Sequence, residues 1–508
     1  MREDWTEIEL GNICFTTSGG TPSRQNKSFY EGKIPWVKSG ELDKGIILDS
    51  EEHITEEAIK KSSAKVFPKG TLLFALYGAT IGKMATLGVE AATNQAICGI
   101  YENDILISKY LYHYLSNKKR KLIGQGIGGA QPNISQTILK KLIIPISPLP
   151  EQRAIVAKIE ELFSDLDKGI ADLKKAQEQL VIFRQAVLKK AFEGGLTKEW
   201  RGQQTDLPTA EELLEQIKVE RQKHSAQQLE NWKHAVKDWE GKGKDGKKPG
   251  KPKITKALPA LTKDELEKLP VLNKYWTWST IDNIAGHEAS SLKAGPFGSS
   301  LKKSFYTETG YKIYGQEQVI AGDSTYGNYY VNEEKFQSLI NCAIAPFDIL
   351  ISLVGTVGKV LVLPEDCEKG IINPRLVKVT LNSFYESVFF KYYFESSFLK
   401  SLYKLKNHGT TMDVLNLGSI KELPYPICSK EEQQQIILEI ESRLSVCDNV
   451  ELSISESLEK ANALRQSILK KAFEGSLLSE EEIAACKAAK DYEPASILLK
   501  KIKAEKKK

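Results

Sequence analysis

The feature that most constrains this chain is an internal repeat. Residues 184–196 read RQAVLKKAFEGGL and residues 465–477 read RQSILKKAFEGSL, so ten of thirteen positions are identical at an offset of 281. Other residues recur at or near this offset: Pro145 as Pro426, Glu151-Gln152 as Glu432-Gln433, and Trp5-Thr6 as Trp276-Thr277. Self-similarity of this extent predicts two copies of one structural unit that arose by duplication.

Each copy begins with a globular region, and we place these regions at residues 1–150 and 273–428. Both contain short runs rich in β-branched and apolar residues, such as 71–76 and 348–353. Clusters of Gly, Pro and Asn separate these runs, as in GGTPSRQN and KAGPFGSS. The pattern predicts short strands joined by turns, in two domains of mixed α/β structure.

A long helix is predicted to follow each domain, at 151–196 and at 429–478. Apolar residues in both segments recur at spacings of three and four, as in the seam of a coiled coil. The seam residues are Ile155, Ile159, Leu166, Leu173, Leu180 and Phe183 in the first helix and Ile436, Ile440 and Ile468 in the second. Arg443 and Cys447 interrupt the aliphatic residues of the second seam.

A helix of about 42 residues is about 63 Å long, and no small domain buries such a helix along its whole length. We therefore expect the two helices to pair with each other. The alternative is that each helix folds back on its own domain. The predicted fold class is α+β: two mixed α/β domains joined by two long antiparallel coiled-coil helices, with a pseudo-two-fold internal repeat.

Two further segments complete the chain. Residues 197–272 form a joint, in which Thr209 and Glu212 are spaced as a capping box that opens a charged helix. The run 241–256 has seven lysines and one acidic residue, and the chain ends in a basic tail at 479–508. The net charge is only +5, and we interpret these runs as solvated, disordered segments.

Several classes of chemistry find no support in the sequence. Gly78 and Gly82 enclose three residues, where a nucleotide-binding loop needs four followed by Lys and Ser or Thr, so the turn that ends at Lys83 is predicted to join two strands. Asn373-Pro374-Arg375 lacks the second proline and the aromatic residue of an amino-methyltransferase motif. The seven cysteines have no spacing typical of zinc sites or disulfides. The chain starts without an apolar signal segment. We predict a cytoplasmic, non-catalytic binding protein with no metal site.

The chain resembles the specificity subunits of type I restriction–modification systems over nearly its whole length. The residues that carry the resemblance are PLPEQR at 148–153, LTKEWR at 196–201, the helix ends LKKAFEGGL and LKKAFEGSL, the AEELLEQIKVER helix, GATIGK at 78–83 and QPNIS at 131–135. One departure is that residues 411–414 read TMDV where residues 131–134 read QPNI.

The resemblance implies that the globular domains are target-recognition domains. They would bind the two halves of an interrupted, asymmetric site in double-stranded DNA, while the helices hold them apart. Two adenine-methyltransferase subunits and motor–nuclease subunits would be the partners, and S-adenosylmethionine, ATP and Mg²⁺ would bind to those partners. No membrane is involved. The alternatives are a recognition module of another restriction–modification or methylation system and a structural coiled-coil scaffold.

Base edges are read by Arg, Lys, Asn and Gln side chains, and the loops of both domains are rich in them. The candidate DNA-binding residues are Arg24, Lys38, Lys83, Asn94, Gln95 and Asn133 in the first domain and Lys302, Gln316, Lys359, Asn373 and Arg375 in the second. Lys83 and Lys359 occupy the repeated turns, and we expect them to contact DNA phosphates.

Overall fold

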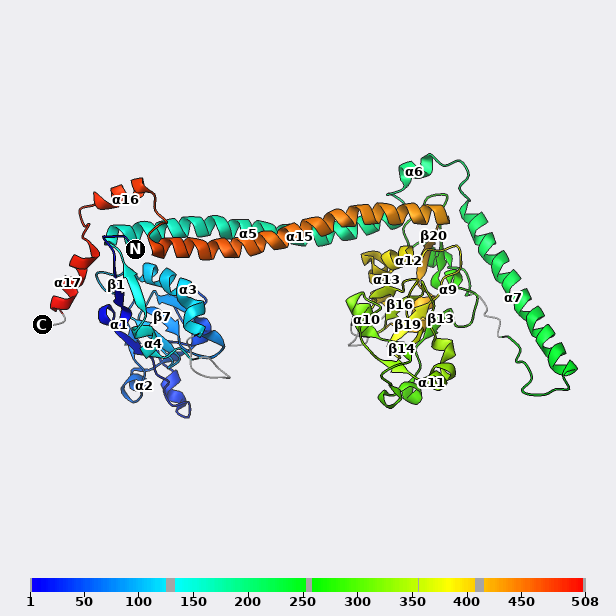
Figure 1. The fold of residues 1–508 in the computed structure, drawn as a ribbon, viewed down its shortest axis with the longest axis horizontal. Coiled ribbons are helices and arrows are strands. Elements are labelled where there is room, and N and C mark those ends of the chain that lie inside the picture. The colour runs from blue at the N-terminus through cyan, green and yellow to red at the C-terminus, as the bar shows by residue number, and fades with distance from the viewer. Residues whose placement is uncertain (1, 125–132, 253–257, 355, 407–414, 506–508) are drawn as a thin grey trace. The chain divides into compact units, whose positions relative to one another are not determined.

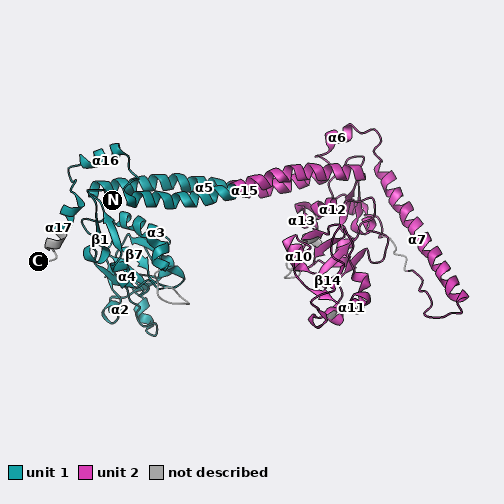
Figure 2. Ribbon diagram, viewed as in Figure 1, with its two compact units in different colours: residues 1–175, 454–508 teal, residues 176–453 magenta. Residues whose placement is uncertain are grey.

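The computed structural model describes residues 2–124, 133–252, 258–354, 356–406 and 415–505. Gln131-Pro132, Gly355, residues 411–414 and the last lysines of the 241–256 run lie outside these ranges. The chain forms two compact units, residues 1–175 with 454–508 and residues 176–453 (Figure 2). Each unit contains one globular domain and a part of both long helices. The boundaries between the units therefore lie within the long helices.

The domain of the first unit is built on two sheets and a strand pair (Figure 1). One sheet has the order β2 (Thr16–Ser18), β10 (Ile97–Ile100), β7 (Leu72–Ala75), β8 (Met84–Leu87) and β4 (Ile46–Ile47). The other has the order β5 (His53–Ile54), β3 (Ile34–Val37), β9 (Ala91–Thr93) and β6 (Val66–Phe67). β1 (Thr6–Glu9) pairs with β11 (Ile143–Ile146), and helix α3 (Ser108–Gly124) precedes β11.

The domain of the second unit repeats this topology. Its larger sheet has the order β13 (Leu292–Ala294), β19 (Leu376–Val379), β16 (Ile349–Ser352) and β17 (Val360–Val362). Its smaller sheet has the order β15 (Tyr330–Val331), β14 (Tyr311–Tyr314) and β18 (Gly370–Ile372). β12 (Thr277–Thr280) pairs with β20 (Pro424–Ile427), and helices α12 (Ser387–Glu395) and α13 (Ser397–Lys406) replace α3. The shared order of strands confirms the predicted repeat and the mixed α/β domains.

The central strands explain why the apolar runs in the sequence are continuous rather than alternating. In β7, Leu72 and Phe74 belong to one hydrophobic cluster, and Leu73 and Ala75 belong to another on the opposite face. β16 divides its side chains between two clusters in the same way. Because both faces of each strand are buried, the positions in these strands are apolar, except for Ser352 at the end of β16, whose buried hydroxyl is hydrogen-bonded.

The long helices are α5 (Leu149–Phe192) and α15 (Lys430–Glu474). In the first unit, Ile155 and Ile159 of α5 share a hydrophobic cluster with Ile468 of α15, and Asp167 pairs with Arg465. In the second unit, Arg184 pairs with Asp448 at 2.5 Å. Residue numbers rise along one helix as they fall along the other, so the helices pack antiparallel, as predicted. The ends of the helices also pack on the domains, where the ring of Phe473 lies 5.1 Å from that of Tyr110.

The seam differs from the prediction at two positions. Ile155, Ile159, Ile436, Ile440 and Ile468 are buried, and Leu166, Leu173 and Leu180 are half-buried, as expected between two helices. Phe183 is 50% exposed and lies outside the seam, because the buried stripe continues from Leu180 through Arg184 to Val187. Cys447 is only 2% exposed, so it belongs to the seam and does not interrupt it.

The segments after each long helix are also related. The joint contains α6 (Lys198–Gly202) and α7 (Ala210–Gly241), and Thr209 and Glu212 form the predicted capping box. The tail contains α16 (Glu480–Lys487) and α17 (Ala495–Glu505). Leu213 and Ile217 pack into the core of the second unit, and Ala495 and Leu498 pack into that of the first. The described part of the basic tail is therefore folded as part of the first unit, although the sequence analysis interpreted the tail as disordered. None of the described helices combines the length and apolar character of a membrane span.

Candidate nucleic-acid interface

Polar side chains from several loops meet at one end of the sheets of the second domain. Gln316 follows β14 and Asn373 follows β18, and the two residues are close because these strands are neighbours and run parallel. The Arg375 guanidinium donates to Gln316 Oε1 at 3.3 Å, and Gln316 Nε2 donates to Ser352 Oγ at 2.8 Å and to the carbonyl of Val354. Three of the predicted residues thus form one cluster.

The backbone around Asn373 holds this cluster in place. Its amide donates to the Tyr314 carbonyl at 2.9 Å, and its Oδ1 accepts from the Arg375 amide at 2.9 Å. Gly295 lies so close that a Cβ there would be 1.8 Å from the Asn373 carbonyl oxygen, so only glycine fits. The loop that begins at Gly295 therefore packs against the cluster.

This loop presents an aromatic side chain that the sequence analysis missed. Phe297 is 78% exposed, two residues beyond Gly295. Lys302 is exposed between two short 3₁₀ helices, Gly298–Leu301 and Lys303–Phe305. The signal in the sequence was the GPFG motif, which places a large apolar residue in a turn instead of a strand.

The two repeated lysines lie in equivalent hairpin turns, as predicted. The amide of Ala75 donates to the carbonyl of Lys83 at 2.9 Å, and the amide of Ser352 donates to that of Lys359 at 3.0 Å. Gly82 and Gly358 have φ values of 74° and 77°, which glycine adopts without strain. The side chains differ, because Lys83 Nζ is 2.9 Å from Asp43 Oδ2. Lys359 is exposed and forms no ion pair with any described side chain.

In the first domain, the candidate cations Arg24 and Lys38 form ion pairs with carboxylates. Arg24 Nη1 lies 2.5 Å from Glu52 Oε2, and its guanidinium lies over the rings of Tyr30 and Trp36, at 4.2 and 4.9 Å from their centroids. Lys38 Nζ contacts Glu51 at 2.9 Å and Glu52 at 3.1 Å. The hydrogen bond from Arg24 holds the pKa of Glu52 below its ordinary value, so this carboxylate stays charged.

The amide candidates of the first domain flank the same loops. The Asn94 amide donates to the carbonyl of Val37, next to Lys38, because β9 runs parallel to β3. The buried Asn94 Oδ1 has no hydrogen-bond partner among the described residues. Gln95 accepts a hydrogen bond from the Thr21 hydroxyl, and Asn133 forms an isolated bridge with Tyr77 beside the Lys83 turn. The candidates of both domains thus gather at equivalent ends of their sheets.

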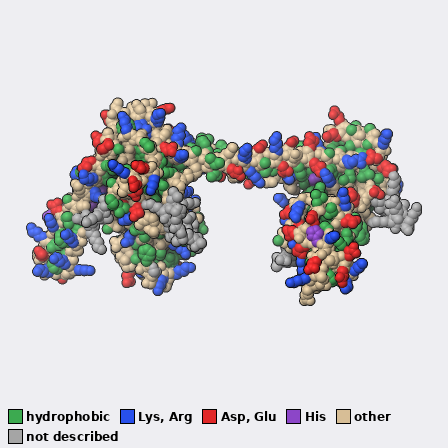
Figure 3. All heavy atoms as spheres, turned by 180° about the vertical axis from the view of Figure 1, so that it is seen from behind, with side chains coloured by type: hydrophobic (Ala, Val, Ile, Leu, Met, Phe, Trp, Pro, Cys, Tyr) green, Lys and Arg blue, Asp and Glu red, His purple; other side chains and the backbone are tan. Residues whose placement is uncertain are grey.

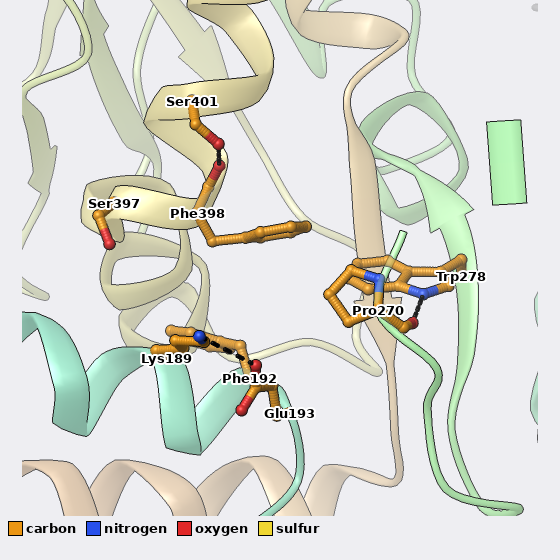
Figure 4. A pocket seen from close by; sticks show the side chains of 8 residues that line it. All are labelled: Lys189, Phe192, Glu193, Pro270, Trp278, Ser397, Phe398 and Ser401. Atoms are coloured by element: carbon orange, nitrogen blue, oxygen red, sulfur yellow. Dashed lines mark hydrogen bonds and ion pairs between the residues drawn. The ribbon is translucent and has the colours of Figure 1, made fainter. Parts of the chain in front are cut away.

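An apolar cavity of the second unit lies elsewhere, between the end of α5 and α13 (Figure 4). It has a volume of about 370 Å³, and its walls include Phe192, Trp278 and Phe398. Trp278 Nε1 donates to the Pro270 carbonyl at 2.9 Å, and the charged groups at the cavity are Lys189 and Glu193, which pair with each other. Among the described residues, no group of His, Cys, Asp and Glu is placed to bind a metal ion.

Two domains of one topology, each with hydrogen-bonding side chains at the same sheet end and each attached to a pair of long helices, define a protein that presents two related binding surfaces. The model of the type I restriction modification DNA specificity domain matches residues 2–176 and 298–460. These ranges cover more than half of the chain and fall in both copies of the repeat. The chain therefore belongs to the family of type I restriction–modification DNA specificity subunits.

Individual relatives agree with this assignment. The specificity subunit of the type I restriction enzyme EcoDI from Escherichia coli is 22% identical over 99% of this chain and 95% of its own length. That of MjaIX from Methanocaldococcus jannaschii is 33% identical over 35% of this chain. The matches to MjaIX and to the Escherichia coli EcoR124I/EcoR124II subunit span only 41% and 46% of those relatives.

Solved structures share the fold. A chain from a structural study of complex assembly and conformational transition in the type I R-M system matches with a TM-score of 0.64 at 17% identity. The match covers 94% of this chain and 99% of that chain. The HsdS subunit from Thermoanaerobacter tengcongensis matches with a TM-score of 0.51 at 17% identity, over 94% and 98% of the two chains.

Proposed function

We propose that this subunit selects the DNA sites at which a type I restriction–modification complex methylates or cleaves. Each domain reads one half of an interrupted, asymmetric site in double-stranded DNA. Two adenine-methyltransferase subunits, and motor–nuclease subunits in the restriction complex, bind S-adenosylmethionine, ATP and Mg²⁺ and carry out the chemistry. The complex acts in the cytoplasm, where its DNA substrate lies.

The observation that carries this proposal is that equivalent loops of one fold carry different side chains. The first domain presents Arg24 and Lys38 paired with carboxylates, whereas the second presents the amide and guanidinium groups of Gln316 and Arg375 joined to each other. Because the scaffolds match and the hydrogen-bonding groups do not, the two domains read different half-sites, and the whole site is asymmetric.

The contacts around these groups support base reading. Gln316 and Arg375 are held by hydrogen bonds before any ligand binds, which lowers the entropy lost when they meet a base. An amide paired with adenine or a guanidinium paired with guanine contributes about 1–3 kcal/mol of discrimination. In the first domain, Arg24 and Lys38 must break their ion pairs with Glu51 and Glu52 before they can bind DNA. These acidic neighbours disfavour binding to sequences that offer phosphates but no matching bases.

The exposed ring of Phe297 adds a second kind of contact to the proposed surface. An aromatic or apolar side chain beside hydrogen-bonding groups can stack on a base or insert at a base step. The first domain has Thr21 at the equivalent place, two residues after Gly19, and its hydroxyl is bonded to Gln95. The two surfaces therefore also differ in shape.

Sequencing of methylated adenines tests the proposal. The chain is expressed with its cognate methyltransferase subunit in cells without adenine methylation, and we expect one two-part motif with unlike halves. Arg375→Ala should relax the half read by the second domain only, and Lys38→Ala the half read by the first. A structural scaffold would leave the motif unchanged in both variants, and methylation by the chain without the methyltransferase subunit would contradict a non-catalytic role.

A further inference from the structure

The end of α7 carries a charge excess that the two recognition surfaces do not explain. Residues 221–252 contain nine Lys and Arg residues and four Asp and Glu residues, an excess of five. The net charge of the whole chain is also +5. The remaining residues sum to zero net charge, because the basic tail and other basic segments are offset there by acidic residues. Figure 3 shows blue side chains gathered at this end of the second unit.

The lysine-rich segment is folded back along the helix, and we call residues 241–252 the lysine hairpin. Trp239 Nε1 donates to the carbonyl of Gly246 at 3.1 Å, and Trp232 Nε1 donates to that of Pro249 at 3.0 Å. Seven residues of helix span about 10.5 Å, and three extended residues span about 10 Å. Three residues are thus enough for the chain to return along the helix between its two tryptophan anchors, and it bends at Gly246 and Lys247. The sequence analysis interpreted the 241–256 run as disordered, whereas two indole groups bond the backbone of its described part.

The lysines of the hairpin point into solvent. The exposed residues are Lys242, Lys244, Lys247, Lys248 and Lys251. None of them forms an ion pair with a described side chain, whereas Lys38 and Lys83 of the first domain both do. Lys251 lies 5.9 Å from the centre of the Trp232 ring, which keeps its ammonium near the anchored backbone.

The hairpin is fixed to the second unit through α7. Leu213 and Ile217 lie in the hydrophobic core of that unit. Further along, Arg221 donates to the carbonyl of Asp282 at 3.0 Å and Gln228 donates to Glu288 at 3.1 Å. The helix therefore carries the five lysines at a set position relative to the recognition surface of the second domain.

We infer that the lysine hairpin binds the phosphate backbone of DNA next to the half-site that the second domain reads. Lysine is a compact point charge that suits phosphates, and it reads no sequence. The segment KGKDGKKPGKP has no apolar side chain other than proline. The core of a protein–protein interface needs aromatic and apolar residues, so the hairpin suits a polyanion better than a protein. The inference rests on the proposed function and adds a second contact with the same DNA.

The test compares two versions of the assembled methyltransferase complex. In one, all five lysines are changed to Gln, and in the matched control all five are changed to Arg. Each lysine that neutralises a phosphate contributes about 0.9 to the slope of log K against log salt. The Gln variant should lower this slope by up to about 4.5 and weaken binding to specific and unrelated duplexes alike. The Arg variant should keep the slope of the original complex, and the methylated motif should be the same in all three.

An unchanged slope in the Gln variant would overturn the inference, and so would loss of the methyltransferase subunit from that complex at an unchanged slope. Thermal unfolding of the Gln variant should match that of the original chain, because all five side chains are exposed. Failure of the proposed function would give a different result from failure of this inference. The original complex would then methylate no two-part motif, whatever the salt dependence of its DNA binding.

Discussion

Arg201 donates two hydrogen bonds to one oxygen of Glu432, from Nη2 at 2.7 Å and from Nε at 2.8 Å, although 231 positions separate the two residues. Both side chains are buried, at 9% and 1% exposure. Thr197 donates to the same oxygen at 2.7 Å. In the first unit, Glu151 occupies the repeated position and accepts instead from Trp5 at 2.8 Å and from Arg2 at 3.3 Å. Both copies thus anchor the start of a long helix through a buried glutamate.

This pair gives the first prediction. Arg201→Ala leaves the buried Glu432 carboxylate without its charge partner, which costs about 3–5 kcal/mol of the free energy of unfolding. Denaturant unfolding should show the loss in the second unit. Lys198→Ala, on the exposed side of the same short helix, is the control and should change stability by less than about 0.5 kcal/mol. A similar small effect of Arg201→Ala would contradict the role of this pair.

The second prediction concerns base reading by the second domain. Gln316→Ala removes an amide that bonds both Ser352 and Arg375. We expect about 1–3 kcal/mol less discrimination at one or two adjacent base pairs of one half-site. Sequencing of methylated adenines would show those positions become degenerate. Glu333→Ala in the same domain, whose carboxylate contacts Tyr311 and Gln337 instead, should leave the motif intact.

The third prediction separates the two turn lysines. If both touch phosphates, each change to Ala weakens binding for all sequences and lowers the salt slope by about one. Asp43→Asn should raise the affinity of the first domain, because it removes the carboxylate 2.9 Å from Lys83. Titrations of binding at several salt concentrations measure both effects. Loss of discrimination at one base pair with an unchanged slope would make either lysine a base reader.

The fourth prediction concerns pH and His113, which lies on α3 between the rings of Tyr112 and Phe163. Burial lowers its pKa from 6.5 to about 4. Below pH 6.5 the His113 imidazole is protonated in the unfolded chain but stays neutral in the folded chain. His113 therefore destabilises the fold progressively from about pH 6.5 down to 4. Thermal unfolding from pH 8 to 4 should show His113→Phe losing less stability than the original chain. Parallel curves for the two proteins would show that His113 does not titrate this way.

The fifth prediction concerns the helix pair. The Asp167–Arg465 pair places Leu173 opposite Glu459, because the helices run antiparallel. Inserting four residues after Leu173 and four after Glu459 adds about 6 Å to both helices and nearly keeps the seam in phase. If helix length sets the gap between half-sites, the methylated motif should gain one or two base pairs in its gap while both halves stay the same. An active complex with an unchanged gap would exclude that role.

The sequence by itself determined the architecture. The repeat of 184–196 at 465–477 established two copies, and the spacing of Ile155, Ile159 and Leu166 identified a long helix that needs a partner. These signals are strong because they are periodic and local, so they depend on backbone geometry alone. The β-branched and apolar runs at 71–76 and 348–353 likewise predicted short strands, and the structure shows that these strands are buried on both faces.

Only the tertiary structure decided which side chains meet. Gln316 and Arg375 are 59 positions apart, and they touch because β14 and β18 are neighbouring parallel strands. The contrast between Lys83, which pairs with Asp43, and the exposed Lys359 cannot be read from the two turn sequences, since both end in Gly-Lys. The folding of the lysine hairpin depends on two indole N–H groups that meet backbone carbonyls. Such contacts depend on how distant segments pack, and composition and spacing carry no record of that packing.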